Sequence, residues 1–319
     1  MKKYLIRRLL ILIPVLLGVS IIVFALVEAM PGNPYSDQID PTVPQEEYQE
    51  RLERMGYYDP LPVRYARWLG RSLTLDFGYS TNYGAPVTEV IAGRLPNTIL
   101  LGGLALVFTI VVAVPLGVIS ATNQYSILDY AVTVFAFIGL SIPAFFFGLL
   151  MIKFLSFELG LFPISGTGLD ADYTGIRMLL HRIHHLILPT IVLGLLSTAS
   201  VMRYTRSSML EVIQQDYIRT ARAKGLNEKI VIYKHALKNA MIPVVTVVAL
   251  MLPTLVSGAV LTETIFSWPG VGTLMIDAIN NRDYPLLMGI TMMLSTVIVF
   301  ANLLADILYA VIDPRIKYD

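Results

Sequence analysis

The sequence predicts an all-α integral membrane protein that crosses the bilayer six times. Its 319 residues are 55% hydrophobic and only 15% charged, and its mean hydropathy is +0.65, far from the composition of soluble domains. A helix needs about 20 predominantly apolar residues to cross a bilayer. Six stretches approach or exceed that length, at roughly Leu9–Ala29, Thr98–Ala121, Tyr130–Leu155, Leu186–Met202, Ile242–Leu261 and Leu286–Ile312.

The first stretch is expected to be a retained membrane helix and not a cleaved signal peptide. It has a basic start, but it is longer than the roughly 7–15 residues of a signal-peptide core, and no small-x-small cleavage site follows it. The second and third stretches are almost free of charge, the fourth is short, and a proline interrupts the fifth. Because proline can kink a membrane helix and let it flex, three prolines are candidate hinge points: Pro115, Pro143 and Pro253.

The last stretch carries a carboxylate, Asp306, one turn after Asn302, so that both side chains share a helical face. A charge at membrane depth is costly and usually has a specific role. Two roles are open for Asp306. We favour pairing with a basic loop residue near the cytoplasmic end of the helix over a proton relay.

The distribution of lysine and arginine predicts that both termini are cytoplasmic. Basic residues flank the first and last stretches, at Lys2, Lys3, Arg7, Arg8, Arg315 and Lys317. The loop 203–240, between the fourth and fifth stretches, holds eight lysines and arginines against three acids. With six spans this loop is cytoplasmic as well.

This topology divides the chain into three parts: residues 1–30 with the first helix, an extracytoplasmic segment 31–96, and a core 97–319 that contains the loop 203–240. In the segment, Glu47 and Arg51 stand four residues apart and favour a charged helix. Arginines and aromatic residues at helical spacing over Val63–Leu75 favour an amphipathic helix at the membrane interface. Such a helix would cap the mouth of a pore, offer a docking surface to a partner, or both.

The most informative stretch is a polar, basic segment inside the loop 203–240. Tyr217, Ala221 and Gly225 fall at i, i+4 and i+8 and are expected to line one slim helical face. Gly225 can end a helix in the left-handed conformation, and Asn227 can cap a second helix that leads toward the next apolar stretch. We expect a helix–glycine–helix hairpin, an exposed handle for a soluble partner. Its candidate residues are Tyr217, Arg219, Thr220, Ala221, Arg222, Ala223, Lys224, Gly225, Leu226, Asn227 and Pro243.

Enzyme signatures are absent from the sequence. It contains no P-loop pattern, no HExxH and no GxSxG, so the chain does not bind ATP in the P-loop manner. It has no cysteine, which excludes disulfides and thiolate metal sites. Imidazoles at i, i+3 and i+4 invite a nickel or zinc site, but no acidic or thiol ligand adjoins them, and a plain interfacial helix end is the favoured interpretation of His181, His184 and His185.

A secondary transporter driven by an ion gradient is the rival function from another class. Such proteins tend to carry paired charges in the middle of the membrane and internal repeats with broken helices. Charges within the apolar stretches are nearly absent here, and the two halves show no evident repeat. A secondary transporter would also give the basic hairpin no function.

The hairpin resembles the cytoplasmic EAA loop of bacterial ABC importer permeases, within the peptide and nickel group. Arg219 and Thr220 replace the family's glutamate and first alanine, whereas Ala221 and Gly225 match its second alanine and its glycine. Pro243 stands farther from the glycine than in the general pattern. The resemblance covers the chain from end to end and includes Met30-Pro31-Gly32, Arg94–Thr98, Phe266–Gly272 and Asp313-Pro314-Arg315. The long segment after the first helix is similar to the first of the two permeases in oligopeptide and dipeptide importers.

The resemblance implies the type I ABC importer permease fold and a location in the cell membrane of a prokaryote. The implied partners are a second homologous permease, two ATPase subunits and an extracytoplasmic substrate-binding protein, with no nucleic acid. ATP and magnesium would be bound by the ATPases, so the chain itself would be neither catalytic nor in need of a cofactor. The implied function is uptake of peptides by alternating access, with nickel or oligosaccharide import as alternatives.

Overall fold

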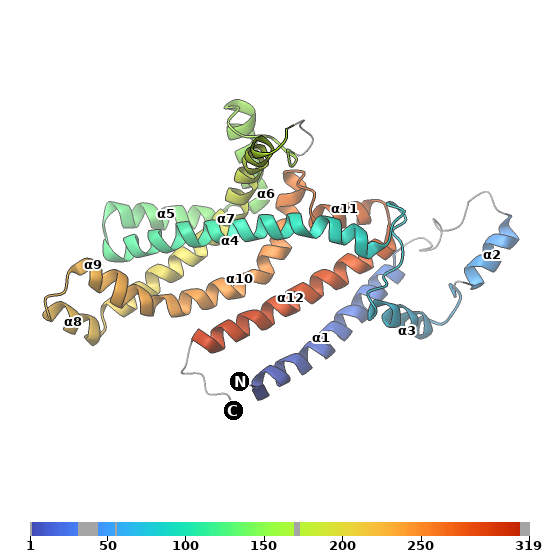
Figure 1. Ribbon diagram of the computed structural model, residues 1–319, viewed down its shortest axis with the longest axis horizontal. Coiled ribbons are helices and arrows are strands. Elements are labelled where there is room, and N and C mark those ends of the chain that lie inside the picture. Colours follow the sequence, from blue (N-terminus) through green and yellow to red (C-terminus); the bar gives the residue numbers. More distant parts are fainter. Residues whose placement is uncertain (1, 31–43, 55, 169–172, 313–319) are drawn as a thin grey trace. The chain divides into compact units, whose positions relative to one another are not determined.

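The computed structural model describes residues 2–30, 44–54, 56–168 and 173–312. These residues form helices joined by turns, with one isolated antiparallel bridge between Tyr79 and Pro86 (Figure 1). The predicted all-α class is confirmed. The chain divides into two compact units, one of residues 1–96 and 270–299, the other of residues 97–269 and 300–319. Two long helices run from one unit into the other, α4 (Val87–Thr122) and α12 (Tyr284–Ile312).

The first unit contains the start of α4, the first part of α12, and α1 (Lys2–Glu28), α2 (Gln45–Arg54), α3 (Leu61–Ser72) and α11 (Val271–Asn280). Its core joins the first turns of α4 and α12 to α11, where Val87, Leu286 and Ile290 are fully buried. The predicted charged helix is α2, in which Glu47 and Arg51 form an ion pair of 2.6 Å. The predicted amphipathic helix is α3.

The second unit contains most of α4 together with α5 (Ile127–Ser141), α6 (Ala144–Met151), the π-helical η2 (Ile152–Glu158), α7 (Ile176–Ile213), α8 (Asp216–Ala223), α9 (Glu228–Ile230), the π-helical η3 (Val231–Ala236) and α10 (Leu237–Ile265). The long helix α7 packs mainly along α10 and α5. Its contact with α4 is close at two glycines. A β-carbon on Gly117 would lie 2.8 Å from the carbonyl oxygen of Met202, and one on Gly194 would lie 2.9 Å from that of Ala105. Small residues of this kind let membrane helices pack backbone to backbone.

Five helices of the described residues are long and apolar enough to cross a membrane, and a bent helix pair brings the number to six if it forms one span. Each predicted apolar stretch therefore lies mainly in one of these helices or in the bent pair. The predicted bounds of the fourth stretch were too narrow, because α7 is 38 residues long and extends beyond the stretch at both ends. Its last turns are polar and basic on one face, whereas Thr205 and Met209 are buried on the other. The number of membrane crossings and the side of each terminus stay predictions.

The third predicted stretch, Tyr130–Leu155, does not form one continuous helix. It is split into α5 and the α6–η2 segment, which meet at an angle of 107°. The cause is Pro143: the residue before a proline is pushed out of the helical region, and Ile142 is extended, with φ −86° and ψ 126°. By contrast, α4 runs through Pro115 and α10 runs through Pro243 and Pro253 without ending. That Pro115, Pro143 and Pro253 act as hinges stays a prediction.

Candidate functional site

The predicted loop 203–240 is shorter in the structure: its first residues belong to α7 and its last to α10, and residues 214–236 between them form a helical hairpin (Figure 1). After α7 ends at Ile213, Gln215 is extended and α8 begins at Asp216, whose carboxylate in the first turn suits the positive end of the helix dipole. On the return side α9, η3 and α10 follow one another without a break, from Glu228 to Ile265. The second helix of the hairpin was expected to lead to an apolar span starting near Pro243. It is instead continuous with that span, and Pro243 lies inside α10.

Gly225 ends α8 as the sequence predicts. Its φ is +74°, in the left-handed region that glycine adopts at little cost. The Gly225 N–H donates to the Arg222 carbonyl over 2.9 Å, and the Leu226 N–H donates to the Ala221 carbonyl over 3.4 Å. These two bonds are those of a Schellman motif, which satisfies the last carbonyl groups of a helix. The turn of the hairpin is thus fixed by its backbone.

Asn227 caps the second helix, also as predicted. Its side-chain oxygen accepts a hydrogen bond of 2.9 Å from the Lys229 N–H. A further contact that the sequence analysis did not anticipate closes the turn: the Arg222 guanidinium donates to the Glu228 carboxylate, with the shortest bond at 2.7 Å. This hydrogen bond raises the pKa of Arg222 above its ordinary value. Because both side chains are largely exposed, the pair orients the turn more than it stabilises the fold.

The hairpin is anchored through its inner face. Ile218 and Ala221 of α8 are buried, and they cluster with residues of α4, α7, η3 and α10, including Val118, Met209 and Val231. This corrects one prediction. Tyr217, Ala221 and Gly225 were expected to line one slim helical face, but Ala221 is only 7% exposed whereas Tyr217 is 45% exposed. A bulky side chain at position 221 would therefore overpack this cluster and would not probe the outer surface.

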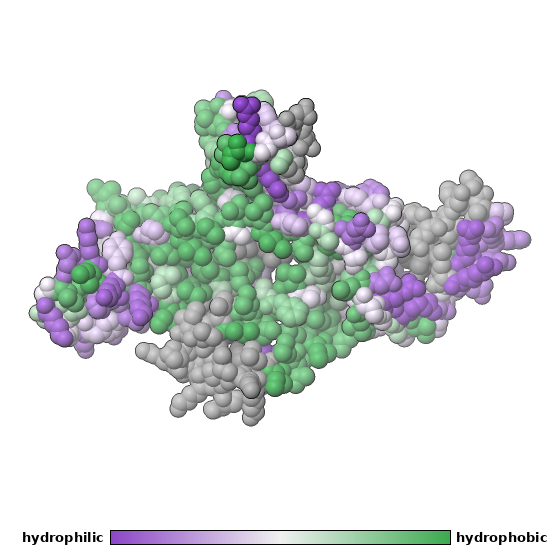
Figure 2. All heavy atoms as spheres, in the orientation of Figure 1, coloured by the Kyte–Doolittle hydropathy of each residue, from purple (hydrophilic) through white to green (hydrophobic). Residues whose placement is uncertain are grey.

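The outer face of the hairpin combines exposed apolar and basic side chains. Most of the remaining candidate residues are exposed: Arg219, Thr220, Arg222, Ala223, Lys224, Gly225, Leu226 and Asn227. Four large hydrophobic side chains also stay exposed, namely Tyr217, Leu226, Ile230 and Tyr233. Figure 2 shows hydrophilic residues gathered over α8 and α9, whereas apolar residues cover α4 and α5. Exposed apolar groups among cations, at the polar end of membrane helices, are typical of a protein–protein contact surface.

A buried charge network at the base of the hairpin was missed by the sequence analysis. Arg206 of α7 binds both carboxylate oxygens of Asp129 in α5, over 2.8 and 3.0 Å. The Ser120 hydroxyl and the Tyr125 N–H also donate to this carboxylate, whose residue is 3% exposed. The sequence signalled only the local part of this network, the serine three residues before an aspartate that is typical of a helix cap: Ser126 caps α5 and accepts from the Asp129 N–H. The network ties the α4–α5 turn to α7.

Two of the short sequence motifs come together in the second unit. The indole of Trp268, which is fully buried, donates to the Asn97 carbonyl over 3.1 Å, and the Asn97 side chain donates to the Pro269 carbonyl over 2.8 Å. One residue further, the Thr98 hydroxyl donates to the buried carboxylate of Glu263 over 2.6 Å. These contacts join the part of α4 at Asn97 and Thr98 to the end of α10 and the turn that follows it.

The histidines that precede the fourth stretch, His181, His184 and His185, lie near the start of α7. The rings are directed at backbone groups: His184 Nε2 lies 2.8 Å from the Leu161 carbonyl oxygen, and His185 Nδ1 lies 2.9 Å from that of His181. Within the described residues no group of three or more His, Cys, Asp or Glu side chains is placed to hold a metal ion. Asp306 is partly buried in α12, and its role stays a prediction.

Comparison with known proteins identifies the family. A model described as the inner membrane component of binding-protein-dependent transport systems matches residues 113–318, and the model of its N-terminal part matches residues 1–102. The chain belongs to this family. The membrane location expected from the sequence is confirmed, because the family is one of inner membrane components and the chain has several helices apolar enough to span a membrane.

Curated relatives match this transport component along its whole length. The oligopeptide transport system permease protein of Bacillus subtilis (strain 168) is 46% identical over 320 residues, and the match covers 100% of both chains. The dipeptide transport system permease protein of Escherichia coli (strain K12) is 39% identical over 337 residues, covering 100% of this chain and 99% of the relative. The expected resemblance to ABC importer permeases is confirmed.

Solved structures support the fold. A methionine ABC transporter in an inward-facing conformation aligns with a TM-score of 0.55 at 17% identity, covering 70% of this chain and 96% of that one. An amino acid ABC transporter crystallised with histidines aligns with a TM-score of 0.53 at 11% identity, covering 70% and 94%. The permease core thus has the type I ABC importer fold that the resemblance implied.

Proposed function

We propose that the chain is one of two permease subunits in an ATP-driven importer that takes up peptides. The observation that carries this proposal is the match over the full length to relatives named as oligopeptide and dipeptide permeases, at 46% and 39% identity. Similarity of this extent includes the long segment 31–96, in which the first permease of such importers is expected to differ from the second.

The proposed partners are a second homologous permease, two ATPase subunits and an extracytoplasmic substrate-binding protein. In this assembly ATP and magnesium are bound by the ATPases, since the sequence lacks a P-loop pattern. The exposed face of the α8–α9 hairpin, with Tyr217 and Lys224, is the proposed contact with an ATPase. Its mixture of apolar and basic side chains suits a groove on a soluble subunit.

The anchoring of the hairpin supports a mechanical role. The buried side of α8 packs on α4, α7 and η3, so that a displacement of the hairpin is transmitted to helices long enough to span the membrane. Gly225 and Asn227 hold the turn in one conformation, and α9 continues into α10, so little of the motion is lost in bending. Closure of the ATPases on ATP would then tilt these helices and expose the pore to alternate sides.

Uptake by a reconstituted complex tests this function. Proteoliposomes that contain the chain, its second permease, the ATPases and the binding protein should accumulate a labelled peptide only with ATP inside. Unlabelled oligo- or dipeptides should compete for uptake, whereas nickel chelates and oligosaccharides should not. The chain alone should neither hydrolyse ATP nor transport peptide. Uptake by the chain alone in a proton or sodium gradient would instead establish a secondary transporter.

A further inference from the structure

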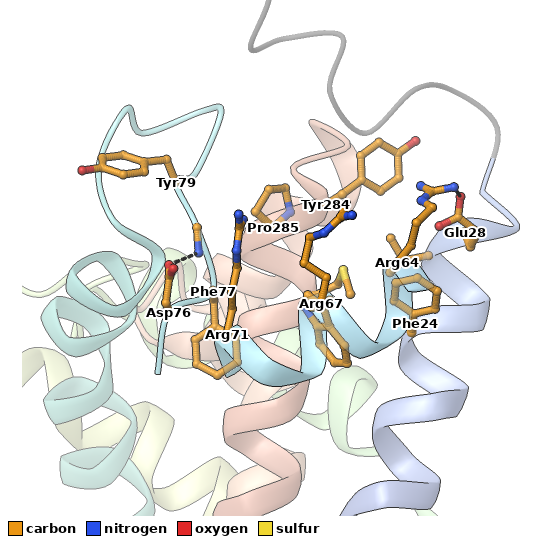
Figure 3. A pocket seen from close by; sticks show the side chains of 14 residues that line it. Phe24, Glu28, Arg64, Arg67, Arg71, Asp76, Phe77, Tyr79, Tyr284 and Pro285 are labelled. Atoms are coloured by element: carbon orange, nitrogen blue, oxygen red, sulfur yellow. Dashed lines mark hydrogen bonds and ion pairs between the residues drawn. The ribbon is translucent and has the colours of Figure 1, made fainter. Parts of the chain in front are cut away.

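In the first unit a cavity of about 270 Å³ opens beside α3 and the last turn of α1 (Figure 3). Three arginines from successive turns of α3 line one wall of it, Arg64, Arg67 and Arg71. Apolar and aromatic side chains line the remainder, among them Phe24 of α1, Phe77 of the following loop, and Tyr284 at the start of α12. The cavity therefore combines cationic and apolar walls.

The three arginines differ in their partners. Arg64 binds Glu28 over 2.7 Å, and both side chains are largely buried, at 11% and 22% exposed. Arg67 binds Asp59 over 2.6 Å in a more exposed pair. The guanidinium of Arg71 makes no hydrogen bond or ion pair with any residue of the described ranges, and Figure 3 shows it on the same side of α3 as that of Arg67. The Arg71 guanidinium thus faces the cavity with a charge that no described residue neutralises.

The carboxylate nearest in sequence does not serve as a partner for Arg71. Asp76 also lines the cavity, but its carboxylate accepts a hydrogen bond of 3.0 Å from the Gly78 N–H and so shapes the loop that follows α3 (Figure 3). An external anion is the natural complement of an unpaired guanidinium beside apolar groups.

The cavity lies at the ends of two apolar helices. Glu28 is the last residue of the span Ile6–Glu28, and Tyr284 is the first residue of the span Tyr284–Ile307; both line the cavity. The ends of spans lie where the hydrocarbon of the bilayer meets the phosphate-containing headgroup layer. Tyrosine and tryptophan are enriched at this depth, and Trp68 of α3 packs on Phe24 of α1 with ring centroids 5.8 Å apart.

The outer surface of α3 also suits contact with lipid. Beside the arginine face runs a second face of small and apolar residues at helical spacing, from Val63, 47% exposed, through Ala66 and Gly70 to Leu73, 78% exposed. Leu75 follows and is 69% exposed. A helix with these two faces lies in the plane of the interface, with its apolar face toward acyl chains and its cations toward phosphates.

We propose that this cavity binds the phosphodiester headgroup of a membrane phospholipid, with Arg71 as the principal phosphate ligand and Arg67 beside it. The planar guanidinium matches phosphate oxygens in a two-pronged hydrogen bond. Leu73 and Leu75 would contact the acyl chains of the same lipid. With the amino terminus in the cytoplasm, the lipid comes from the extracytoplasmic leaflet. This inference goes beyond the transport function and does not depend on the cargo.

Native mass spectrometry of the purified full chain tests the proposal with three probes: phosphatidylglycerol, phosphatidylethanolamine, and a glucosyl diacylglycerol that lacks phosphate. The wild-type chain should retain both phospholipids in preference to the glycolipid. Arg71→Ala should weaken phospholipid retention about tenfold, which corresponds to about 1.4 kcal/mol. The matched control is Arg51→Ala, which removes a partly exposed arginine of α2 that is paired with Glu47 and does not line the cavity. It should retain lipid as the wild type does.

A graded series keeps the test independent of folding. Since Arg71 is exposed, its substitutions should leave the thermal unfolding of the chain in detergent unchanged. Retention should fall in the order arginine, lysine, alanine, glutamate at position 71. Equal retention across this series, or equal retention of the glycolipid, would overturn the proposal. If Arg71→Glu kept its lipid but no longer bound the purified substrate-binding protein, the cavity would be a protein docking surface instead.

Discussion

Gly225 gives the sharpest test of the hairpin as a rigid coupling element. Its φ of +74° is left-handed, and an L residue with a β-carbon in this region loses about 1–2 kcal/mol. A β-carbon built on Gly225 meets no atom within 4 Å, so the penalty is backbone strain alone. Valine, which is β-branched, should suffer most and alanine less. Asparagine tolerates the left-handed region and should behave nearly as glycine does.

The assay is ATP hydrolysis stimulated by the binding protein in the reconstituted complex, alongside the amount of chain inserted in the membrane. Gly225→Val should lower stimulated hydrolysis and peptide uptake while insertion stays near normal, because about 1–2 kcal/mol of strain is local to the turn. Gly225→Asn should retain both activities near the wild-type level. Lys229→Ala is the control, since an exposed charge contributes about 0–1 kcal/mol. Full activity of Gly225→Val would show that the turn conformation is not needed for coupling.

Three further predictions concern packing and topology. Arg206→Met should lower the free energy of unfolding of the chain in detergent by about 3 kcal/mol, the lower end for a broken buried pair, because the buried Asp129 carboxylate loses its partner. Adding Asp129→Asn should recover part of this loss. An equal loss in the single and double variants would refute the pairing. Gly194→Val should destabilise the chain through its close contact with α4, and unchanged unfolding would refute that contact. Single cysteines at Lys224 and Gln45 should react with a membrane-impermeant thiol reagent from opposite sides of the membrane, with Gln45 labelled from outside; the reverse pattern would invert the topology.

The local structure of the hairpin was predictable from single residues. Gly225 and Asn227 act within two or three residues of themselves, through a left-handed φ and a side-chain cap, and the sequence shows both signals directly. The burial of Ala221 was not predictable in the same way. Ala221 is buried against α4, which is distant in sequence, and against η3. The i, i+4 spacing with Tyr217 does not reveal which face of a short helix meets the core.

The long-range pairs were the other part that the sequence did not reveal. In the sequence, Arg206 was interpreted only as one of the basic residues of a cytoplasmic loop. Nothing near it in sequence indicates that Asp129 is its partner. The bend at Pro143 shows the same limit. A proline in an apolar stretch predicts either a kinked helix or a break, and here the extended Ile142 and the following helix α6 decide for a break.

The central claim is that the exposed face of the α8–α9 hairpin contacts the ATPase. The sequence has no cysteine, so a single cysteine can be introduced and cross-linked within the assembled importer. The test positions are Tyr217 and Lys224, and the control is Tyr173, which is exposed and expected on the extracytoplasmic side. Tyr217→Cys and Lys224→Cys should each form a cross-link to the ATPase subunit, and the yield should change when ATP is added. Tyr173→Cys should form none. Absence of cross-links from both hairpin positions in an assembled, active complex would contradict the claim.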